Sequence, residues 1–193
     1  MTMGAIVLAA GSSRRFGDDK RKSLLGSGKT ILATSIENVA SCFDEVLVVL
    51  RSGDHDFGSV LESSLSDPAI TFYCAPDSAK GMAHSLANAI HQVKNWNAAA
   101  ILLGDMPFLK QETIGLLLTS YSQSEGQQPI VIPTKDGTHG HPVIFHHRYF
   151  ADIEKLEGDT GARAVIQANL DKVIEVPVDD EGIVRDIDTP EDI

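Results

Sequence analysis

The residues Gly4-Ala-Ile-Val-Leu-Ala-Ala-Gly11-Ser-Ser-Arg-Arg-Phe-Gly17-Asp-Asp-Lys20-Arg-Lys22 indicate how this chain folds. The apolar run from 4 to 9 predicts a buried strand, and small residues follow it directly. Gly11 can adopt the positive φ of a tight turn, and small side chains let a ligand approach the backbone. Five Lys/Arg residues lie between positions 14 and 22, although the formal net charge of the chain is -11. A basic loop is usually a solvated surface, but the turn before it favours a site for a phosphorylated small molecule.

Apolar runs and helical patterns alternate along the rest of the chain. Strands are expected at 4–9, 45–50, 70–74, 98–103, 129–132 and 173–178, with a candidate antiparallel strand at 142–145. Apolar residues recur at intervals of three and four in five other segments, which are therefore expected to be helices. These segments are 30–41, 54–65, 81–93, 111–122 and 160–169. Nearly unbroken apolar strands between helices predict an α/β fold, a mostly parallel sheet covered on both faces in one domain over 1–193.

The composition excludes several classes of protein. With 42% hydrophobic and 22% charged residues, the chain has the composition of a globular protein, and it contains no apolar run long enough to cross a membrane. None of its segments is expected to be a signal peptide. The pI of about 4.9, without a basic face larger than 14–22, argues against a nucleic-acid partner. Cys42 and Cys74 match no metal-ligand or redox spacing. We therefore expect a protein of the reducing cytoplasm.

Three loops are expected to carry the chemistry, because ligands of open α/β sheets bind beyond the carboxyl ends of the strands. They are 10–22, 75–81 and 104–108. Asp105 follows a purely apolar strand, and Pro107 separates it from the next helix, so it is not an obvious helix cap. A carboxylate beside a phosphate-binding loop suits Mg²⁺, which prefers hard oxygen ligands. Gly81 begins a helix whose N–H groups can bind an anion, although a ligand-free loop glycine and an ordinary helical Ser85 explain that segment equally well.

The loop at 136–142 and the segments after it are less specific. His139 and His141 could bind a metal, but no further Cys or His supports a zinc site, so a substrate contact or a plain turn is favoured. In 157–163, Asp159 or Thr160 suits a helix N-cap, and the flanking glycines and Arg163 also suit an anion contact.

The acidic C-terminal segment allows two interpretations. Acidic tails are usually solvated surfaces. If this segment folds back to the carboxyl edge of the sheet, Asp188 or Asp186 could supply a second carboxylate to the metal.

Taken together, five ordered motifs resemble those of the MobA-like nucleotidyltransferases. They are Leu8-Ala-Ala-Gly-x-Ser-x-Arg15-Phe-Gly17-x-x-Lys20, Gly104-Asp-Met-Pro107, Gly140-His-Pro142, Gly158-Asp-x-Gly-Ala-Arg163 and Asp186-x-Asp-Thr-Pro-Glu-Asp192. The Ala-Ala-Gly form is similar to the CTP-using branch, the molybdenum cofactor cytidylyltransferases (MocA-like). The resemblance covers almost the whole chain. It implies a three-layer α/β/α Rossmann-like fold of the nucleotide-diphospho-sugar transferase type.

The resemblance also implies roles for particular residues. Its expected catalytic residues are Arg15, Lys20 and Asp105. Its expected nucleotide contacts are Leu8, Ala9, Ala10, Gly11, Ser13, Arg15, Lys20, Lys22, Gly81 and Ser85. The pterin-substrate side is expected at His141, Asp159 and Arg163, and the Mg²⁺ ligands are expected to be Asp105 and Asp188, with Asp186 as the alternative to Asp188.

One lysine assignment stays open within this set. Lys20 fits the family's Gly-x-x-Lys pattern and Lys22 fits its Lys-x-Leu-Leu pattern, so either lysine can be the phosphate contact. Lys20 is favoured, because its distance from Gly17 sets its position in the loop.

The activity implied by the resemblance is Mg²⁺-dependent transfer of CMP from CTP to the phosphate of molybdopterin or molybdenum cofactor, with release of pyrophosphate. The implied partners are CTP, a phosphorylated pterin-type acceptor and, transiently, a molybdoenzyme or its chaperone. Alternatives remain for the substrates, which could be another nucleoside triphosphate or a sugar or alcohol phosphate acceptor. A further alternative is a non-catalytic cofactor-binding or chaperone module on the same fold. A dinucleotide-dependent oxidoreductase is disfavoured, because Gly-x-Gly-x-x-Gly does not follow the first strand.

Overall fold

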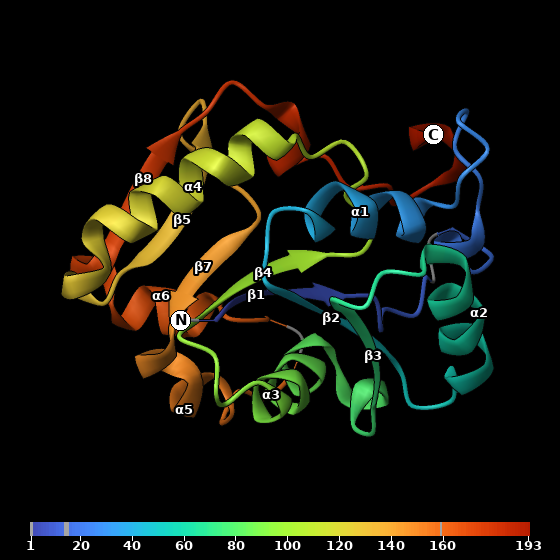
Figure 1. The fold of residues 1–193 in the computed structure, drawn as a ribbon, viewed down its shortest axis with the longest axis horizontal. Coiled ribbons are helices and arrows are strands. Elements are labelled where there is room, and N and C mark those ends of the chain that lie inside the picture. Colours follow the sequence, from blue (N-terminus) through green and yellow to red (C-terminus); the bar gives the residue numbers. More distant parts are fainter. Residues whose placement is uncertain (1, 14–15, 159) are drawn as a thin grey trace.

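A computed structural model describes residues 2–13, 16–158 and 160–193, which build one mixed sheet between two layers of helices (Figure 1). Its strands are β1 (Met3–Leu8), β2 (Glu45–Arg51), β3 (Ile70–Ala75), β4 (Ala98–Leu103), β5 (Ile130–Lys135), β6 (Thr138–His139), β7 (Val143–His146) and β8 (Val173–Pro177). Their order is β3-β2-β1-β4-β7-β5-β6, and β8 also pairs with β5. Strands β1 to β4 are parallel, as are β5 and β8, whereas β7 is antiparallel to β4 and β5. The predicted α/β fold and the antiparallel strand near 142–145 are confirmed.

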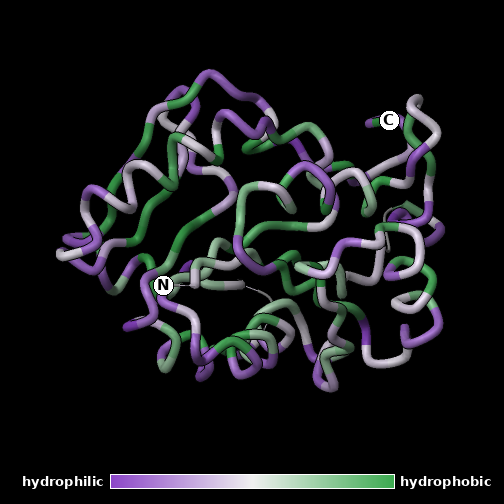
Figure 2. Tube along the Cα trace, viewed as in Figure 1, coloured by the Kyte–Doolittle hydropathy of each residue, from purple (hydrophilic) through white to green (hydrophobic). Residues whose placement is uncertain are grey.

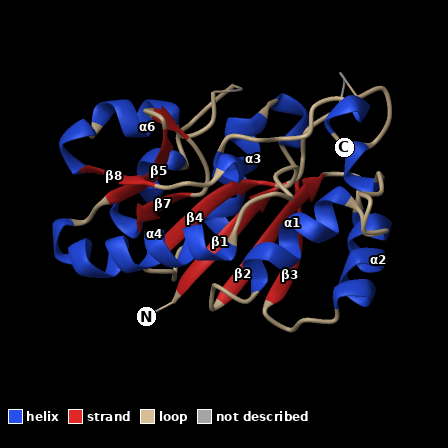
Figure 3. Ribbon diagram, turned by 90° about the horizontal axis from the view of Figure 1, so that it is seen from above, coloured by secondary structure: helices blue, strands red, loops and turns tan. Residues whose placement is uncertain are grey.

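The helices cover both faces of this sheet (Figure 3). They are α1 (Ile31–Ala40), α2 (His55–Leu65), α3 (Met82–Gln92), α4 (Gln111–Ser124), α5 (Phe150–Ile153) and α6 (Arg163–Ala168). Buried side chains of α1, α2 and α4 pack in one apolar cluster, and those of α3, α5 and α6 pack in another. The structure therefore has the expected three layers. None of the described helices has the length and apolar character needed to cross a membrane.

The strand β1 explains why the decisive run of sequence is apolar throughout. Ala5 and Val7 belong to the cluster on one face of the sheet, and Ile6 and Leu8 belong to the cluster on the other. A central strand is buried on both faces, so alternation of polar and apolar residues disappears. Figure 2 shows the same pattern as hydrophobic strands inside a more hydrophilic surface.

Two of the predicted element boundaries change for identifiable reasons. The strand predicted to end at 132 continues through Pro133, which lies opposite Val176 of β8. Pro133 also lies beyond Val131, the last residue of β5 that pairs with β7. The helix predicted for 160–169 begins only at Arg163, after Gly161 with a φ of 56°. A left-handed residue cannot lie inside an α-helix.

Helix capping also differs from the sequence-based interpretation. Ala162 is the N-cap of α6, so Thr160 does not cap it, and Asp159 lies outside the described residues. Asp54 is the N-cap residue of α2, but its carboxylate makes no capping hydrogen bond to that helix. It accepts a hydrogen bond from the Arg51 backbone N–H at 3.1 Å instead.

Candidate functional site

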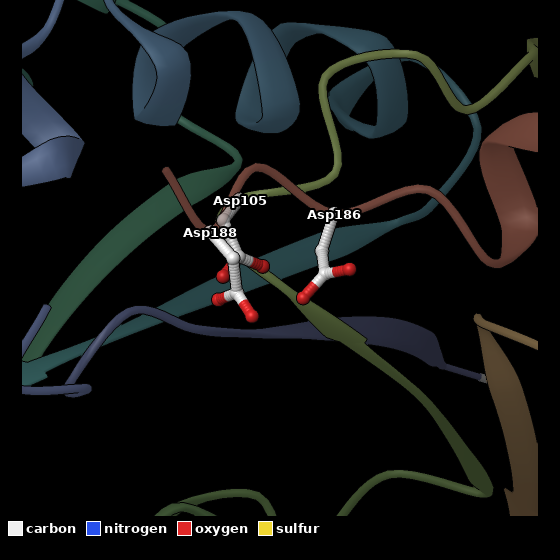
Figure 4. A group of neighbouring side chains, drawn as sticks. All are labelled: Asp105, Asp186 and Asp188. Atoms are coloured by element: carbon white, nitrogen blue, oxygen red, sulfur yellow. The ribbon is translucent and has the colours of Figure 1, made fainter. Parts of the chain in front are cut away.

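Three aspartate side chains meet beyond the carboxyl end of β4 (Figure 4). Asp105 follows β4, and Asp186 and Asp188 belong to the C-terminal segment; one carboxylate oxygen of each lies within 4.8 Å of the others. The Oδ1 atom of Asp105 is buried and accepts no hydrogen bond from any described residue. A buried carboxylate oxygen without a partner is unfavourable unless a cation binds it. The arrangement therefore fits a divalent cation with hard oxygen ligands.

A buried carboxylate anchors the C-terminal segment that carries two of these aspartates. Asp180, only 2% exposed, accepts hydrogen bonds from Thr113 Oγ1 at 2.7 Å, Gly182 N at 2.8 Å and Lys110 N at 3.0 Å. The first and last of these donors lie at the start of α4. Because a buried carboxylate needs such donors, the chain turns back here toward the carboxyl edge of the sheet.

Two glycines then let the C-terminal segment pack against the sheet edge backbone to backbone. A Cβ atom on Gly182 would lie 2.3 Å from the carbonyl oxygen of Phe108, and one on Gly140 would lie 2.4 Å from that of Ile183. Further along, Ile187 N donates to the carbonyl of Asp105 at 3.0 Å. The segment thus folds back to the edge, and it brings both Asp186 and Asp188 to Asp105. Their role as metal ligands stays a prediction.

Lys20 lies between the carboxylates. Its Nζ atom is 2.6 Å from Asp105 Oδ2, 3.3 Å from Asp188 Oδ1 and 2.8 Å from the carbonyl oxygen of Ile187. Burial by itself lowers the pKa of Lys20, but the two carboxylates outweigh burial and raise that pKa above its ordinary value. The pKa of Asp186 is also raised, by burial first and then by repulsion from Asp105 and Asp188. Lys20 and the three aspartates therefore form one coupled charged cluster.

The other two described basic residues of the loop, Arg21 and Lys22, lie elsewhere. Lys22 extends over the ring of Phe57 in α2, with its Nζ 5.0 Å from the ring centroid. Arg21 is 4% exposed; it donates to both carboxylate oxygens of Asp19 at 2.7 Å and also pairs with Asp54. The expected phosphate contact Arg15 lies outside the described residues. Of the described lysines and arginines in the loop, only Lys20 contacts the acidic cluster.

Arg21 is a structural residue, although the sequence pattern counted it among the five basic residues of an expected phosphate-binding loop. The signal for it was available in the sequence, because Asp18 and Asp19 stand directly before Lys20 and Arg21. An acidic pair inside a basic loop indicates internal pairing rather than a free positive surface.

The turn after β1 differs from its predicted conformation. Positive φ angles occur at Ser13 (50°) and Gly17 (81°), and Gly11 is not among the residues with positive φ. Gly104 packs closely against this turn from the end of β4. A Cβ atom on it would lie 2.9 Å from Ala9 Cβ and 2.8 Å from a methyl of Leu32. Gly104 N donates to the carbonyl of Leu8 at 2.9 Å. The ends of β1 and β4 are therefore held side by side.

The start of α3 is already partly satisfied by protein groups. Gly81, with a φ of 129°, is its N-cap, and Ala83 N donates to the carbonyl of Gly158 at 3.0 Å. The Ser85 hydroxyl, in a residue 2% exposed, donates to the carbonyl of Gly81 at 3.3 Å. Not every N–H of this turn is thus left for a ligand. Nucleotide contacts by Gly81 and Ser85 stay predictions.

The residues expected on the pterin side are divided between two places. His141 lies against the end of β4, with Nδ1 3.2 Å from the carbonyl oxygen of Ile101. Burial lowers its pKa, and this effect outweighs the Ile101 hydrogen bond and the charges of Asp105 and Asp186. Arg163 is exposed at the start of α6. Asp159 lies outside the described residues, so it cannot be placed in either group.

Comparison with known proteins identifies clear relatives. Residues 5–173 match the family model of the MobA-like NTP transferase domain. The chain is 29% identical over 196 residues to the purine catabolism protein PucB of Bacillus subtilis, covering 97% of this chain and 92% of that protein. It is 27% identical over 188 residues to the molybdenum cofactor cytidylyltransferase of Escherichia coli, covering 97% and 91%. Proteins named as probable molybdenum cofactor guanylyltransferases also match.

A solved structure supports the fold. The crystal structure of Rv0371c from Mycobacterium tuberculosis superposes with a TM-score of 0.77 and 23% identity, covering 100% of this chain and 96% of that one. At this level of identity the similarity concerns the fold alone.

Proposed function

The chain belongs to the MobA-like NTP transferase domain family, and from this premise we propose that it transfers CMP from CTP to the phosphate of molybdopterin or molybdenum cofactor, releasing pyrophosphate. The observation that carries the proposal is the cluster of Lys20 with Asp105, Asp186 and Asp188 at the carboxyl ends of β1 and β4. A lysine paired with convergent carboxylates beside a small-residue turn suits a metal-bound triphosphate.

The proposed roles follow from charge and position. Asp105 and Asp188, together with Asp186, would hold Mg²⁺, which when bound offsets negative charge on phosphate oxygens. Lys20 would stabilise the charge that develops on the departing pyrophosphate, and Arg15 is proposed to assist it. The acceptor phosphate is anionic at neutral pH, so no strong general base is required. Catalysis is then mainly positioning and charge neutralisation.

The choice of nucleotide is proposed from the first motif. Its Ala9-Ala10-Gly11 form is similar to the CTP-using branch, and the Escherichia coli relative is named as a cytidylyltransferase. The relatives named as guanylyltransferases make GTP the second candidate. His141, Asp159 and Arg163 are proposed for the pterin side, with a molybdoenzyme or its chaperone as the recipient of the product in the cytoplasm.

Pyrophosphate release tests the proposal. The purified chain is incubated with Mg²⁺ and each of the four nucleoside triphosphates, with and without a molybdopterin-type acceptor. We expect release that needs both CTP and the acceptor. Release with GTP alone among the nucleotides would move the assignment to guanylyl transfer, and release with a sugar phosphate instead of the pterin would replace the acceptor. No release with any combination would favour a binding module.

A further inference from the structure

Arg51, the last residue of β2, reaches across to the turn that follows β1. Its Nε atom donates to the carbonyl of Gly11 at 3.0 Å, and its Nη2 atom contacts the same carbonyl and the Ser13 hydroxyl, the latter at 3.4 Å. Its Nη1 atom lies 3.6 Å from a carboxylate oxygen of Asp19. Only 29% of the Arg51 side-chain surface is exposed. One guanidinium therefore joins both sides of the loop 11–19.

Arg21 supports the same turn from the buried side. Its Nη1 atom donates to the carbonyl of Ala9 at 3.0 Å, and its other nitrogens hold Asp19, the same carboxylate that pairs with Arg51. Asp54 pairs with Arg21 and accepts from the Arg51 backbone. Two arginines at the β2 side of the loop thus bind the alternate carbonyls of Ala9 and Gly11.

These two bonds fix the direction of the neighbouring N–H groups. A trans peptide is planar, with its C=O and N–H pointing in opposite directions. With the carbonyls of Ala9 and Gly11 turned toward the arginines, the N–H groups of Ala10 and Ser12 point the other way. Among the described residues, none accepts a hydrogen bond from either N–H group. Gly11 and Ser12 are exposed, so a ligand can reach this stretch.

The order of the strands shows the direction in which the N–H groups of Ala10 and Ser12 point. Strand β1 lies between β2 and β4, with Arg51 at the end of β2 and Asp105 just after β4. Successive peptide groups already alternate in direction one residue earlier. The Leu8 carbonyl accepts from Gly104 N on the β4 side, whereas Ala9 N donates to the carbonyl of Val49 on the β2 side. The N–H groups of Ala10 and Ser12 therefore face the side of Asp105 and Lys20.

We propose that Arg51 is a positioning residue, which with Arg21 orients the Ala10 and Ser12 N–H groups toward anionic oxygens of the bound nucleotide. The inference rests on the proposed function for the identity of that ligand. Arg51 acts here through the loop rather than by touching the phosphates. Its effect should depend on the fork of the guanidinium and not on its charge alone, because a single ammonium cannot span Gly11, Ser13 and Asp19 together.

The test compares Arg51→Met and Arg51→Lys with the wild type, using ¹⁵N relaxation, a CTP titration followed by amide chemical shifts, and steady-state kinetics. Lys29→Met is the control, because it removes one positive charge from an exposed residue paired with Glu37. In wild type we expect order parameters of about 0.85 at Ala10 and Ser12, falling below about 0.6 in both Arg51 variants. CTP should shift both amides, and KM for CTP should rise roughly tenfold to a hundredfold, more than kcat falls.

Different outcomes separate the two proposals. Unchanged order parameters in Arg51→Met would overturn the role of Arg51, whatever the chain binds. Wild-type KM in Arg51→Lys would show that charge alone suffices and would overturn it too, as would amides of Ala10 and Ser12 that stay unshifted while other amides respond to CTP. If no nucleotide shifts any amide or is turned over, the proposed function fails, and with it the assignment of these N–H groups to phosphate.

Discussion

At the residue scale, Lys20 is a cation that contacts the acidic cluster directly. In the structure its ammonium bridges Asp105 and Asp188, the carboxylates proposed to bind the metal. A divalent cation at this cluster must compete with that ammonium for Asp105 Oδ2. The same side chain is proposed to stabilise phosphate charge once nucleotide is bound, so Lys20 has two opposing effects that can be measured separately.

The variant Lys20→Met should therefore bind Mn²⁺ or Mg²⁺ more tightly in the absence of nucleotide, while its transfer rate falls by roughly 10²–10³. Isothermal titration measures the first effect and product formation the second. Lys22→Met is the matched control, since Lys22 lies over Phe57, and it should change neither quantity. Weaker metal binding by Lys20→Met, or a large loss of rate in Lys22→Met, would contradict this description of the two lysines.

His141 gives a prediction about pH. Burial lowers its pKa, so the folded state favours the neutral imidazole. That contribution to stability is fully present above the unfolded pKa of about 6.5 and is lost as the pH falls from there through the lowered folded-state pKa. The variant His141→Gln should lose less unfolding free energy than wild type between pH 7.5 and 5.5, measured by urea denaturation. An equal or steeper loss in the variant would refute this sign.

At the scale of elements, the C-terminal segment completes the acidic cluster, because it supplies two of the three carboxylates, Asp186 and Asp188. It leaves β8, is anchored at Asp180, and runs back along the loop that follows β4. Without this segment only Asp105 of the three carboxylates remains. The anchor can be tested without touching any proposed ligand.

Asp180→Ala removes the acceptor of three hydrogen bonds and leaves buried donors without a partner. We expect a loss of roughly 3 kcal/mol in unfolding free energy, in the range found for hydrogen bonds to charged groups, and weaker metal binding because Asp186 and Asp188 lose their position. Asp179→Ala is the control: its side chain is 97% exposed and pairs only with Lys135 among the described residues, so it should lower the unfolding free energy far less than Asp180→Ala does. Equal losses in the two variants would argue against the anchor.

Sequence patterns predicted the elements better than their ends. The centres of β1 to β4 follow from apolar runs that burial on both faces requires, and α1 was placed to within a residue at each end. The late start of α6 depends on the left-handed conformation of Gly161. The position of the Asp54 carboxylate depends on its hydrogen bond from the Arg51 backbone N–H. These are local backbone and tertiary effects that periodicity does not encode.

At the scale of the whole molecule, the site joins segments that lie far apart in the sequence. Lys20 and Asp188 are 168 residues apart and touch. The strand that ends before Asp105 predicted that this residue lies at the sheet edge, but the return of the C-terminal segment remained conditional. It depends on Gly140 and Gly182 meeting specific backbone atoms, and no spacing rule predicts such contacts. The pairing of Arg51 with the loop after β1 was missed for the same reason.

The single domain over 1–193 stays a prediction, and we base its test on the two apolar clusters, which share the strands of one sheet. We expect thermal unfolding as one transition, with a calorimetric enthalpy equal to the van't Hoff enthalpy. Two resolved transitions in scanning calorimetry would instead indicate separate units.

We propose that this chain transfers the α-phosphorus of CTP, as CMP, to a pterin phosphate and that Asp105 is needed for this transfer. The most direct measurement follows α-³²P-labelled CTP, with Mg²⁺ and a molybdopterin-type acceptor, in wild type and in Asp105→Asn. We predict label in the pterin dinucleotide, one pyrophosphate per product, and a rate at least about 100-fold lower in a folded Asp105→Asn protein. Label that never reaches the acceptor, or an Asp105→Asn variant as fast as wild type, would contradict the proposed transfer and the role of Asp105 in it.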